Sequence, residues 1–496
     1  MQMQNNLLNI RSDNPYYQLV AKDILKHIPK ELKEIADNIP QLPILSTDNY
    51  FLHYSIYPIL TTSNEDQVLQ KVLDIYREYT KSKEYQSTKI LTTLDDELSK
   101  IHSYMLTRTI LEKIREKMKD KLDRMRSGEE GRKTLSSISP QMRDDVDAGA
   151  HLDALMNRLF QDASQGNQKA QQLLQQITST AVSDVINRLH EKVQEAREKG
   201  KDLPREVKEV FEEAKESTEK AKDLKDLMSG GRKAGKTGTS FEKLLNLLDK
   251  LVEVEGVSDI LTLSKKITDS IPRFAHIKKQ RDRHGTEVYG YRLTRNLEHA
   301  LPRELALPDD LFYYKLASQG LLSKEKIRIM EGAYYVVIDK SGSMEGKKTI
   351  WARSVALALY RLARRKNRRY FLRFFDTEVY PIDDPIERPE EIIEHIVKVH
   401  SSGGTSIDNA LLTAVRDIRQ SRLSEYTNTV ILITDGEDHV TIDPSRLKEN
   451  NITLVAVMIE GENSTLRKLA EESGGQYLKA ELDERGALKI VKIAER

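Results

Sequence analysis

The chain has 496 residues, of which 32% are charged, and its formal net charge is +1 at pH 7. This length predicts two or three domains, and the near-zero net charge gives no electrostatic footprint for nucleic acid or an anionic membrane. The absence of cysteine excludes disulfides, thiolate metal ligands and cysteine catalysis.

Segments that could direct the chain to or through a membrane are not expected. The longest apolar runs, at 428–434 and 452–459, are far too short to span a bilayer. The first residues lack a basic start followed by an uninterrupted apolar stretch, so no signal peptide is predicted. These patterns predict a cytoplasmic protein with no transmembrane segment.

Residues 1–270 are predicted to be a helical region, because apolar residues recur there every three or four positions. Two such stripes lie in 105–125 and 170–193, and a third helix is expected at 204–228. Linkers are expected at 127–140 and 229–239. The two stripes consist of Leu111, Ile114, Met118, Leu122 and Met125, and of Leu173, Ile177, Ile186, Leu189 and Val193.

The second linker contains GGRKAGKT at 230–237, which fits the phosphate-binding pattern G-x-x-x-x-G-K-[ST]. That loop requires a buried strand before it and a helix after it. Residues 219–228 are charged at every second or third position and favour a helix. Residues after Ser240, a suitable N-cap, also favour a helix. A Gly- and Lys-rich linker is the preferred interpretation, and a nucleotide-hydrolysing function remains the alternative.

A connecting segment at 271–330 precedes a change of pattern at residue 331. From 331 to 496, short strands rich in Val and Ile alternate with helix-length segments. The expected strands are 333–339, 369–376, 379–383, 429–435, 452–459 and 475–480. This alternation predicts an α/β doubly wound domain with a mostly parallel sheet, whose ligands bind at the carboxyl ends of the strands.

Oxygen-bearing side chains follow those strand ends. DKSGSM supplies Asp339, Ser341 and Ser343, SGGTS supplies Thr405, and the strand at 429–435 ends with Asp435. An oxygen-only set suits Mg²⁺, with Mn²⁺ or Ca²⁺ as alternatives. Incomplete coordination by these residues would leave room for a partner's carboxylate. A phosphatase of the D-x-D type would need Asp where this chain has Ser341, so no catalytic residue is predicted.

The order D-x-S-x-S, then Thr, then Asp resembles the metal-ion-dependent adhesion site (MIDAS) of von Willebrand factor A (VWA) domains. The resemblance covers roughly 332–496. It implies a Rossmann-like fold, a metal held by Asp339, Ser341, Ser343, Thr405 and Asp435, and metal-dependent protein binding without catalysis.

Residues 285–326 resemble the segment that precedes the VWA domain in CoxE- and ViaA-like proteins, through Leu301-Pro302, 304–307 and Leu311-Phe312. The long helical first half followed by the metal-binding domain also resembles ViaA. This resemblance implies an adaptor for a MoxR-family AAA+ ATPase in chaperone-like protein maturation or remodelling. Besides the nucleotide hypothesis, an RNA- or scaffold-binding VWA protein remains an alternative.

Overall fold

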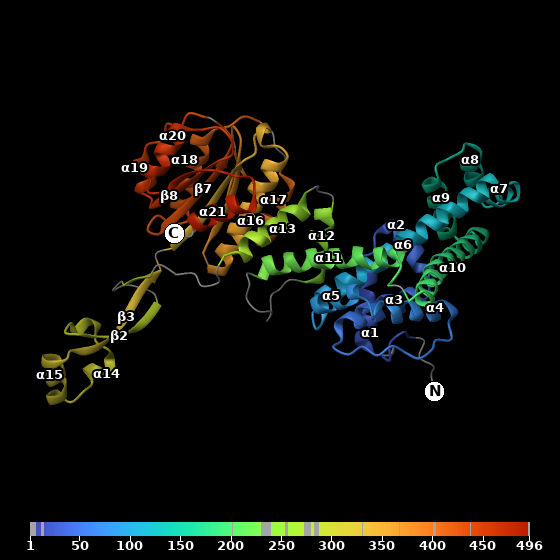
Figure 1. Ribbon diagram of the computed structural model, residues 1–496, viewed down its shortest axis with the longest axis horizontal. Coiled ribbons are helices and arrows are strands. Elements are labelled where there is room, and N and C mark those ends of the chain that lie inside the picture. Colours follow the sequence, from blue (N-terminus) through green and yellow to red (C-terminus); the bar gives the residue numbers. More distant parts are fainter. Residues whose placement is uncertain are drawn as a thin grey trace. The chain divides into compact units, whose positions relative to one another are not determined.

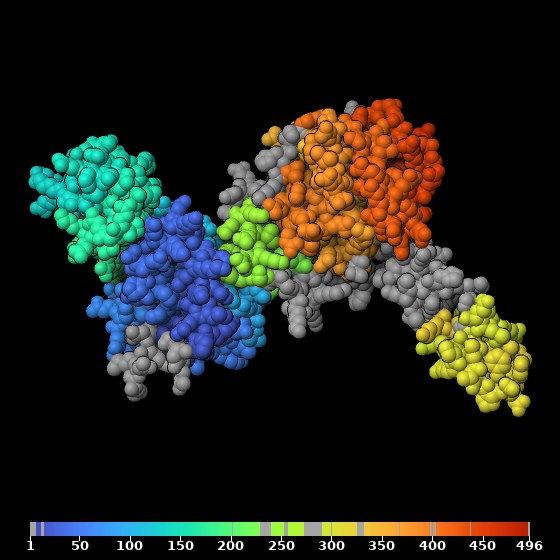
Figure 2. Space-filling model, turned by 180° about the vertical axis from the view of Figure 1, so that it is seen from behind, coloured from blue at the N-terminus to red at the C-terminus, as the bar shows by residue number. Residues whose placement is uncertain are grey.

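The protein is described from a computed structural model. The described residues are 6–10, 14–200, 202–229, 240–252, 256–271, 279–281, 287–329, 331–366, 368–399, 403–436 and 438–494, and they carry the sequence colours in Figures 1 and 2. The chain forms two compact units, one from residues 1–225 and 238–248 and the other from 226–237 and 249–496.

Helices dominate the first unit. Those that begin in it are α1 (Pro15–Lys26), α2 (Lys30–Asp37), α3 (Leu42–Tyr54), α4 (Gln67–Tyr79), α5 (Lys83–Thr92), α6 (Asp96–Ser127), α7 (Glu129–Ser136), α8 (Pro140–Asp147), α9 (Leu152–Ser164), α10 (Gln168–Glu198), α11 (Arg205–Ser229) and α12 (Phe241–Val252). The predicted stripes lie on α6 and α10 and are mostly buried, whereas Met125 and Leu189 are only half-buried. The helical character of the first half is therefore confirmed.

The linker expected at 127–140 is largely helical instead. It contains α7, and Pro140 is the first residue of α8. Leu135 is fully buried, and Glu129 pairs with Lys133 one turn later at 3.0 Å. Gly and Ser disfavour a helix here, but burial of Leu135 and the acidic residues in the first turn of α7 stabilise one more strongly.

The phosphate-loop pattern at 230–237 lies outside the described residues. The residues before it, 219–228, belong to α11, so they are helical as predicted and not a strand. Behind it, the Ser240 hydroxyl accepts a hydrogen bond from the Lys243 N–H at 3.3 Å, which is the predicted N-cap of α12. The strand that a phosphate loop requires is therefore replaced by a helix.

In the second unit, α13 (Val257–Asp269) packs against α16 (Lys347–Lys366) of the C-terminal domain. A three-stranded antiparallel sheet in the order β1-β3-β2 follows. The connecting elements are β1 (Lys279–Arg281), β2 (Glu287–Thr294), η1 (Leu297–His299), α14 (Pro302–Leu305), α15 (Asp309–Ser318) and β3 (Leu321–Ile329). This small sheet was not expected from the sequence.

The C-terminal domain contains a six-stranded sheet in the order β6-β5-β4-β7-β8-β9, with helices on both faces (Figure 1). All strand pairs are parallel except β5–β6. The strands are β4 (Glu331–Asp339), β5 (Tyr370–Phe375), β6 (Val379–Tyr380), β7 (Thr427–Thr434), β8 (Ile452–Met458) and β9 (Gln476–Lys479). The predicted fold class, a doubly wound domain after a helical region, is confirmed.

The helices of this domain follow the alternation predicted from the sequence, with two additions, the short η2 and the C-terminal α21. They are η2 (Gly342–Met344), α16 (Lys347–Lys366), α17 (Pro389–Lys398), α18 (Ile407–Gln420), α19 (Pro444–Lys448), α20 (Ser464–Glu472) and α21 (Glu484–Ala494). The sequence interpretation ended with the last strand and missed α21. This helix buries Ala487, Ile490 and Val491, and it packs against α13 and α16.

The topology places the candidate site. β4 lies in the middle of the sheet, paired with β5 on one side and with β7 on the other. After β4 the chain passes to β5 on one side, and after β7 it passes to β8 on the other side. The carboxyl ends of β4 and β7 therefore lie where the winding direction reverses, which is the place where ligands of doubly wound sheets bind. Asp339 is the last residue of β4, and Asp435 directly follows β7.

Candidate metal centre

Asp339 is held at the end of β4 by two hydrogen bonds. Its side chain is almost fully buried, its Oδ1 accepts from the Ser341 N–H at 2.8 Å, and its Oδ2 accepts from the Thr434 hydroxyl at 2.5 Å. Burial raises the pKa of Asp339, and the charge of Asp435 adds to this, while the hydrogen bonds from Thr434 and Ser341 oppose it. A buried carboxylate of this kind is stabilised by a nearby cation.

The two serines lie on the tight turn that follows. Ser341 precedes η2 and is buried, whereas Ser343 within η2 is exposed. Their hydroxyl oxygens are 3.1 Å apart, and the Ser343 hydroxyl donates to Asp435 Oδ1 at 2.7 Å. The turn therefore brings the β4 loop and the β7 loop into one hydrogen-bonded group.

Thr405 lies beside the residue that follows Asp435. A Cβ added to Gly436 would lie 2.7 Å from Thr405 Cγ2 and 3.1 Å from Thr405 Oγ1. Glycine is therefore needed at 436 so that the two loops can approach each other. All five predicted ligands are consequently gathered at one edge of the sheet.

An ion pair fixes the loops around this group. Lys340 Nζ lies 2.6 Å from Asp376 Oδ2, and the Asp376 carbonyl accepts from the Ser406 N–H at 2.7 Å. Burial alone would raise the pKa of Asp376, but the hydrogen bonds from the Glu378 N–H and from Lys340 hold it below its ordinary value. The pair ties the strand ends of β4 and β5 to the loop that carries Thr405.

The donor set fits a hard divalent cation. It consists of two carboxylates and three hydroxyls, and oxygen donors are those that Mg²⁺, Mn²⁺ and Ca²⁺ prefer. Within the described ranges, no group of three or more His, Asp or Glu side chains could hold a metal ion. A metal at this edge would therefore depend on the serine and threonine hydroxyls as well as on Asp339 and Asp435.

Sequence reasoning missed three participants. Lys348 in the first turn of α16 donates to Asp435 Oδ2 at 2.8 Å, Thr434 holds Asp339, and Asp376 pairs with Lys340. Thr434 could have been found, because it is the last residue of β7 beside a strand-end aspartate. The partners of Lys348 and Asp376 are distant in sequence, so no local pattern reveals them.

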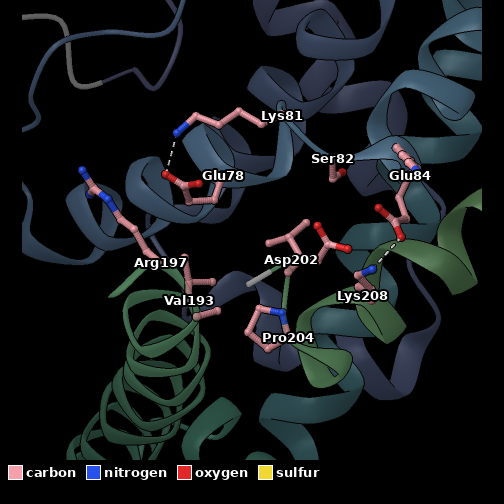
Figure 3. Close-up of a pocket in the computed structure, with 12 residues that line it drawn as sticks. Glu78, Lys81, Ser82, Glu84, Val193, Arg197, Asp202, Pro204 and Lys208 are labelled. Atoms are coloured by element: carbon pink, nitrogen blue, oxygen red, sulfur yellow. Dashed lines mark hydrogen bonds and ion pairs between the residues drawn. The ribbon is translucent and has the colours of Figure 1, made fainter. Parts of the chain in front are cut away.

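The first unit has a separate pocket of about 250 Å³ between the α4–α5 turn and the α10–α11 turn (Figure 3). Ion pairs link Lys81 to Glu78 at 2.7 Å and Lys208 to Glu84 at 3.1 Å. Because cationic and anionic side chains neutralise one another along the lining, the pocket does not select a ligand of one charge.

Comparison with known proteins assigns the C-terminal domain to a family. Residues 335–492 match the family model of the von Willebrand factor type A domain, so the second unit carries a VWA domain. An uncharacterized protein of Methanocaldococcus jannaschii is 26% identical over 349 residues, covering 66% of this chain and 75% of that protein. A putative VWFA domain-containing protein of Acidianus two-tailed virus is 34% identical over 162 residues, covering 29% of this chain and 17% of its own length.

Among solved structures, an aerotolerance-related membrane protein from Bacteroides fragilis matches with 16% identity and a TM-score of 0.27, covering 32% of this chain and 96% of that chain. In the part of this chain that the structure describes, none of the helices has an apolar stretch of the length needed to cross a membrane.

Proposed function

Because residues 335–492 form a VWA domain, a domain that commonly mediates protein–protein interaction, we propose that this protein is a non-enzymatic, metal-dependent adaptor. Asp339, Ser341, Ser343, Thr405 and Asp435 would hold Mg²⁺, with Mn²⁺ or Ca²⁺ as the other ions the same oxygens suit. When bound, the ion supplies an electrophilic position for a carboxylate of a partner protein.

The observation that carries the proposal is the convergence of these oxygen atoms. Hydrogen bonds join the Ser341 and Ser343 hydroxyls and connect Ser343 to Asp435, and the same turn engages Asp339. Asp339 is buried, while Ser343 is exposed at the rim. The arrangement therefore offers both an anchored carboxylate and an accessible side from which a partner can approach.

Other residues of the chain position the proposed ligands. Lys340 and Asp376 fix the loops, Gly436 allows Thr405 to approach, and Thr434 orients the Asp339 carboxylate. The partner contributes Glu or Asp, because only an anionic oxygen ligand adds both a coordinating atom and charge compensation to the ion.

The partner is proposed to be a MoxR-family AAA+ ATPase, with which the protein would act in the cytoplasm in chaperone-like maturation or remodelling of other proteins. Support comes from the sequence before the domain, where residues 301–312 resemble the corresponding segment of CoxE- and ViaA-like proteins. In the structure this stretch contains α14 and the start of α15, and β3 follows the end of α15.

A pull-down tests the proposal. Tagged protein is incubated in native lysate with Mg²⁺, beside a variant with both Ser341→Ala and Ser343→Ala. A control variant carries Ser164→Ala and Ser179→Ala, two exposed serines on α9 and α10. We expect the wild type and the control to recover an AAA+ ATPase and the site variant to lose it. Because Mg²⁺ stays present, the ATPase's own metal requirement does not affect the comparison. Equal recovery by all three proteins would refute a metal-mediated contact.

A further inference from the structure

Lys348 engages the candidate metal centre from outside the predicted ligand set. Its ammonium Nζ lies 2.8 Å from Asp435 Oδ2 and 2.7 Å from Glu460 Oε2. The Asp435 side chain is only 2% exposed, whereas that of Glu460 is 70% exposed. Lys348 therefore bridges a buried carboxylate of the site and a solvated carboxylate of the loop after β8.

The position of Lys348 follows from the start of α16. The helix begins at Lys347, a few residues after the turn that carries the serines, and the Thr349 hydroxyl donates to the Met344 carbonyl and ties helix to turn. Lys348 is thus held next to the loop that it must reach, and only 19% of its side chain is exposed.

Both oxygens of Asp435 are engaged. Oδ1 accepts from the Ser343 hydroxyl and Oδ2 from the Lys348 ammonium. Lys348 therefore neutralises one of the two carboxylates that would attract a cation, and a divalent ion placed among the ligand oxygens would lie close to a fixed positive charge. Repulsion between charges at short range and low solvent access is large on the scale of binding free energies.

We propose that Lys348 is an internal competitor of the metal, which holds Asp435 when no ion is bound and sets the metal affinity of the site below what the ligands alone would give. This inference rests on the proposed function, because it takes Asp435 as a metal ligand. Binding of the ion weakens the Lys348–Asp435 contact, and the ammonium then remains with Glu460.

Glu460 connects this exchange to the molecular surface. It occupies a left-handed backbone conformation, with φ of 65°, which is uncommon for a residue with a side chain. It lies in the turn between β8 and α20. Because Lys348 contacts both Asp435 and Glu460, metal binding at Asp435 would change how strongly the ammonium pairs with this exposed surface carboxylate.

The test compares Mn²⁺ affinity, measured by electron paramagnetic resonance, in the full-length wild type and in Lys348→Met. Lys347→Met is the matched control, because Lys347 is the adjacent residue, carries the same charge and is exposed. We expect Lys348→Met to bind Mn²⁺ at least about tenfold more tightly than the wild type. Lys347→Met should change the affinity by less than about twofold at 0.15 M salt, since exposed charges are screened.

Asp435→Asn separates this inference from the proposed function. If the wild type binds Mn²⁺, Asp435→Asn loses it, and Lys348→Met binds no more tightly than the wild type, then the competitor role of Lys348 is wrong and the metal site stands. If none of the proteins binds Mn²⁺, both proposals fail. A purely structural role for Lys348 would lower the thermal midpoint without raising the affinity per folded molecule.

Two further measurements keep the test decisive. Lys348→Arg retains the charge and should keep an affinity near that of the wild type, whereas Lys348→Gln should behave as Lys348→Met if the methionine variant does not fold. Trp351, the chain's single tryptophan, lies three residues along α16 and is buried. Its fluorescence reports the integrity of α16 in each variant.

Discussion

At the scale of single residues, the site depends on oxygen atoms that sequence patterns identify and on contacts that they do not. Asp339, Ser341, Ser343 and Asp435 lie in one hydrogen-bonded group, and Thr405 lies beside Gly436. The motif could be predicted because its residues lie at the end of a strand, in the turn after it or shortly before a helix. Lys348 could not, since its two partners lie on loops far along the chain. The role of the five residues as metal ligands stays a prediction.

Gly436 is the residue at which the packing of the two loops is most easily disturbed. Gly436→Ala would place a methyl group 2.7 Å from Thr405 Cγ2, so Thr405 must move away. We expect a loss of about 1–3 kcal/mol in the free energy of unfolding of the domain, measured by urea denaturation followed through Trp351, and weaker Mn²⁺ binding.

Gly342 provides the control for this substitution. It lies in the serine turn of the same site, but a Cβ built there meets no atom within 4 Å. Gly342→Ala should therefore change the free energy of unfolding by less than about 0.5 kcal/mol. Equal effects of the two substitutions would mean that the contact between Thr405 and Gly436 does not organise the site.

At the scale of elements, helix α3 has an unusual inner face. It buries Asp48, Asn49 and His53 against the other helices of the first unit, and the His53 ring lies 4.1 Å from that of His102 on α6. Both imidazoles are fully buried. The sequence predicted α6 from its apolar stripe further along the helix, but the period of apolar residues carries no signal for a polar core.

His102 makes this core sensitive to acid. Burial lowers the pKa of His102 to about 4, below its ordinary value of about 6.5 in an unfolded chain. Between these two values the unfolded state binds more protons than the folded state. The stability that the neutral imidazole contributes is therefore complete above about pH 6.5 and is lost as the pH falls towards 4.

We therefore expect the stability difference between wild type and His102→Asn to shrink on acidification. The difference in free energy of unfolding between the wild type and the variant should be about 2–3 kcal/mol smaller at pH 4.5 than at pH 7. It is measured by urea unfolding of the two full-length proteins, followed by circular dichroism. Groups that His102 does not influence cancel in this difference; Asp48, whose pKa burial raises to about 7, is present in both proteins. A difference that is independent of pH would show that His102 is protonated equally in both states.

At the scale of the whole molecule, the helical first half and the order of strands and helices in the second half could be predicted. Period and residue type specify both patterns. The connecting region was harder, because neither strand shows a regular alternation: β2 contains Gly290, and β3 contains a run of three charged residues at 324–326. The two strands pair across the segment between them, and local sequence carries no signal for that pairing. Helix α21 did carry a signal, since Ala487, Ile490 and Val491 share one face, but it lies beyond the last predicted strand.

We propose above all that the carboxyl ends of the neighbouring strands β4 and β7 bind a divalent cation. Isothermal titration calorimetry of Mg²⁺ into the full-length protein and into the variant with both Ser341→Ala and Ser343→Ala tests it most directly. We predict one ion per chain for the wild type and loss of binding in the double variant. Without metal, the two proteins should have the same Trp351 fluorescence, which would show that the double variant is folded. Equal Mg²⁺ affinity of the two proteins, or no binding by either, would contradict the claim.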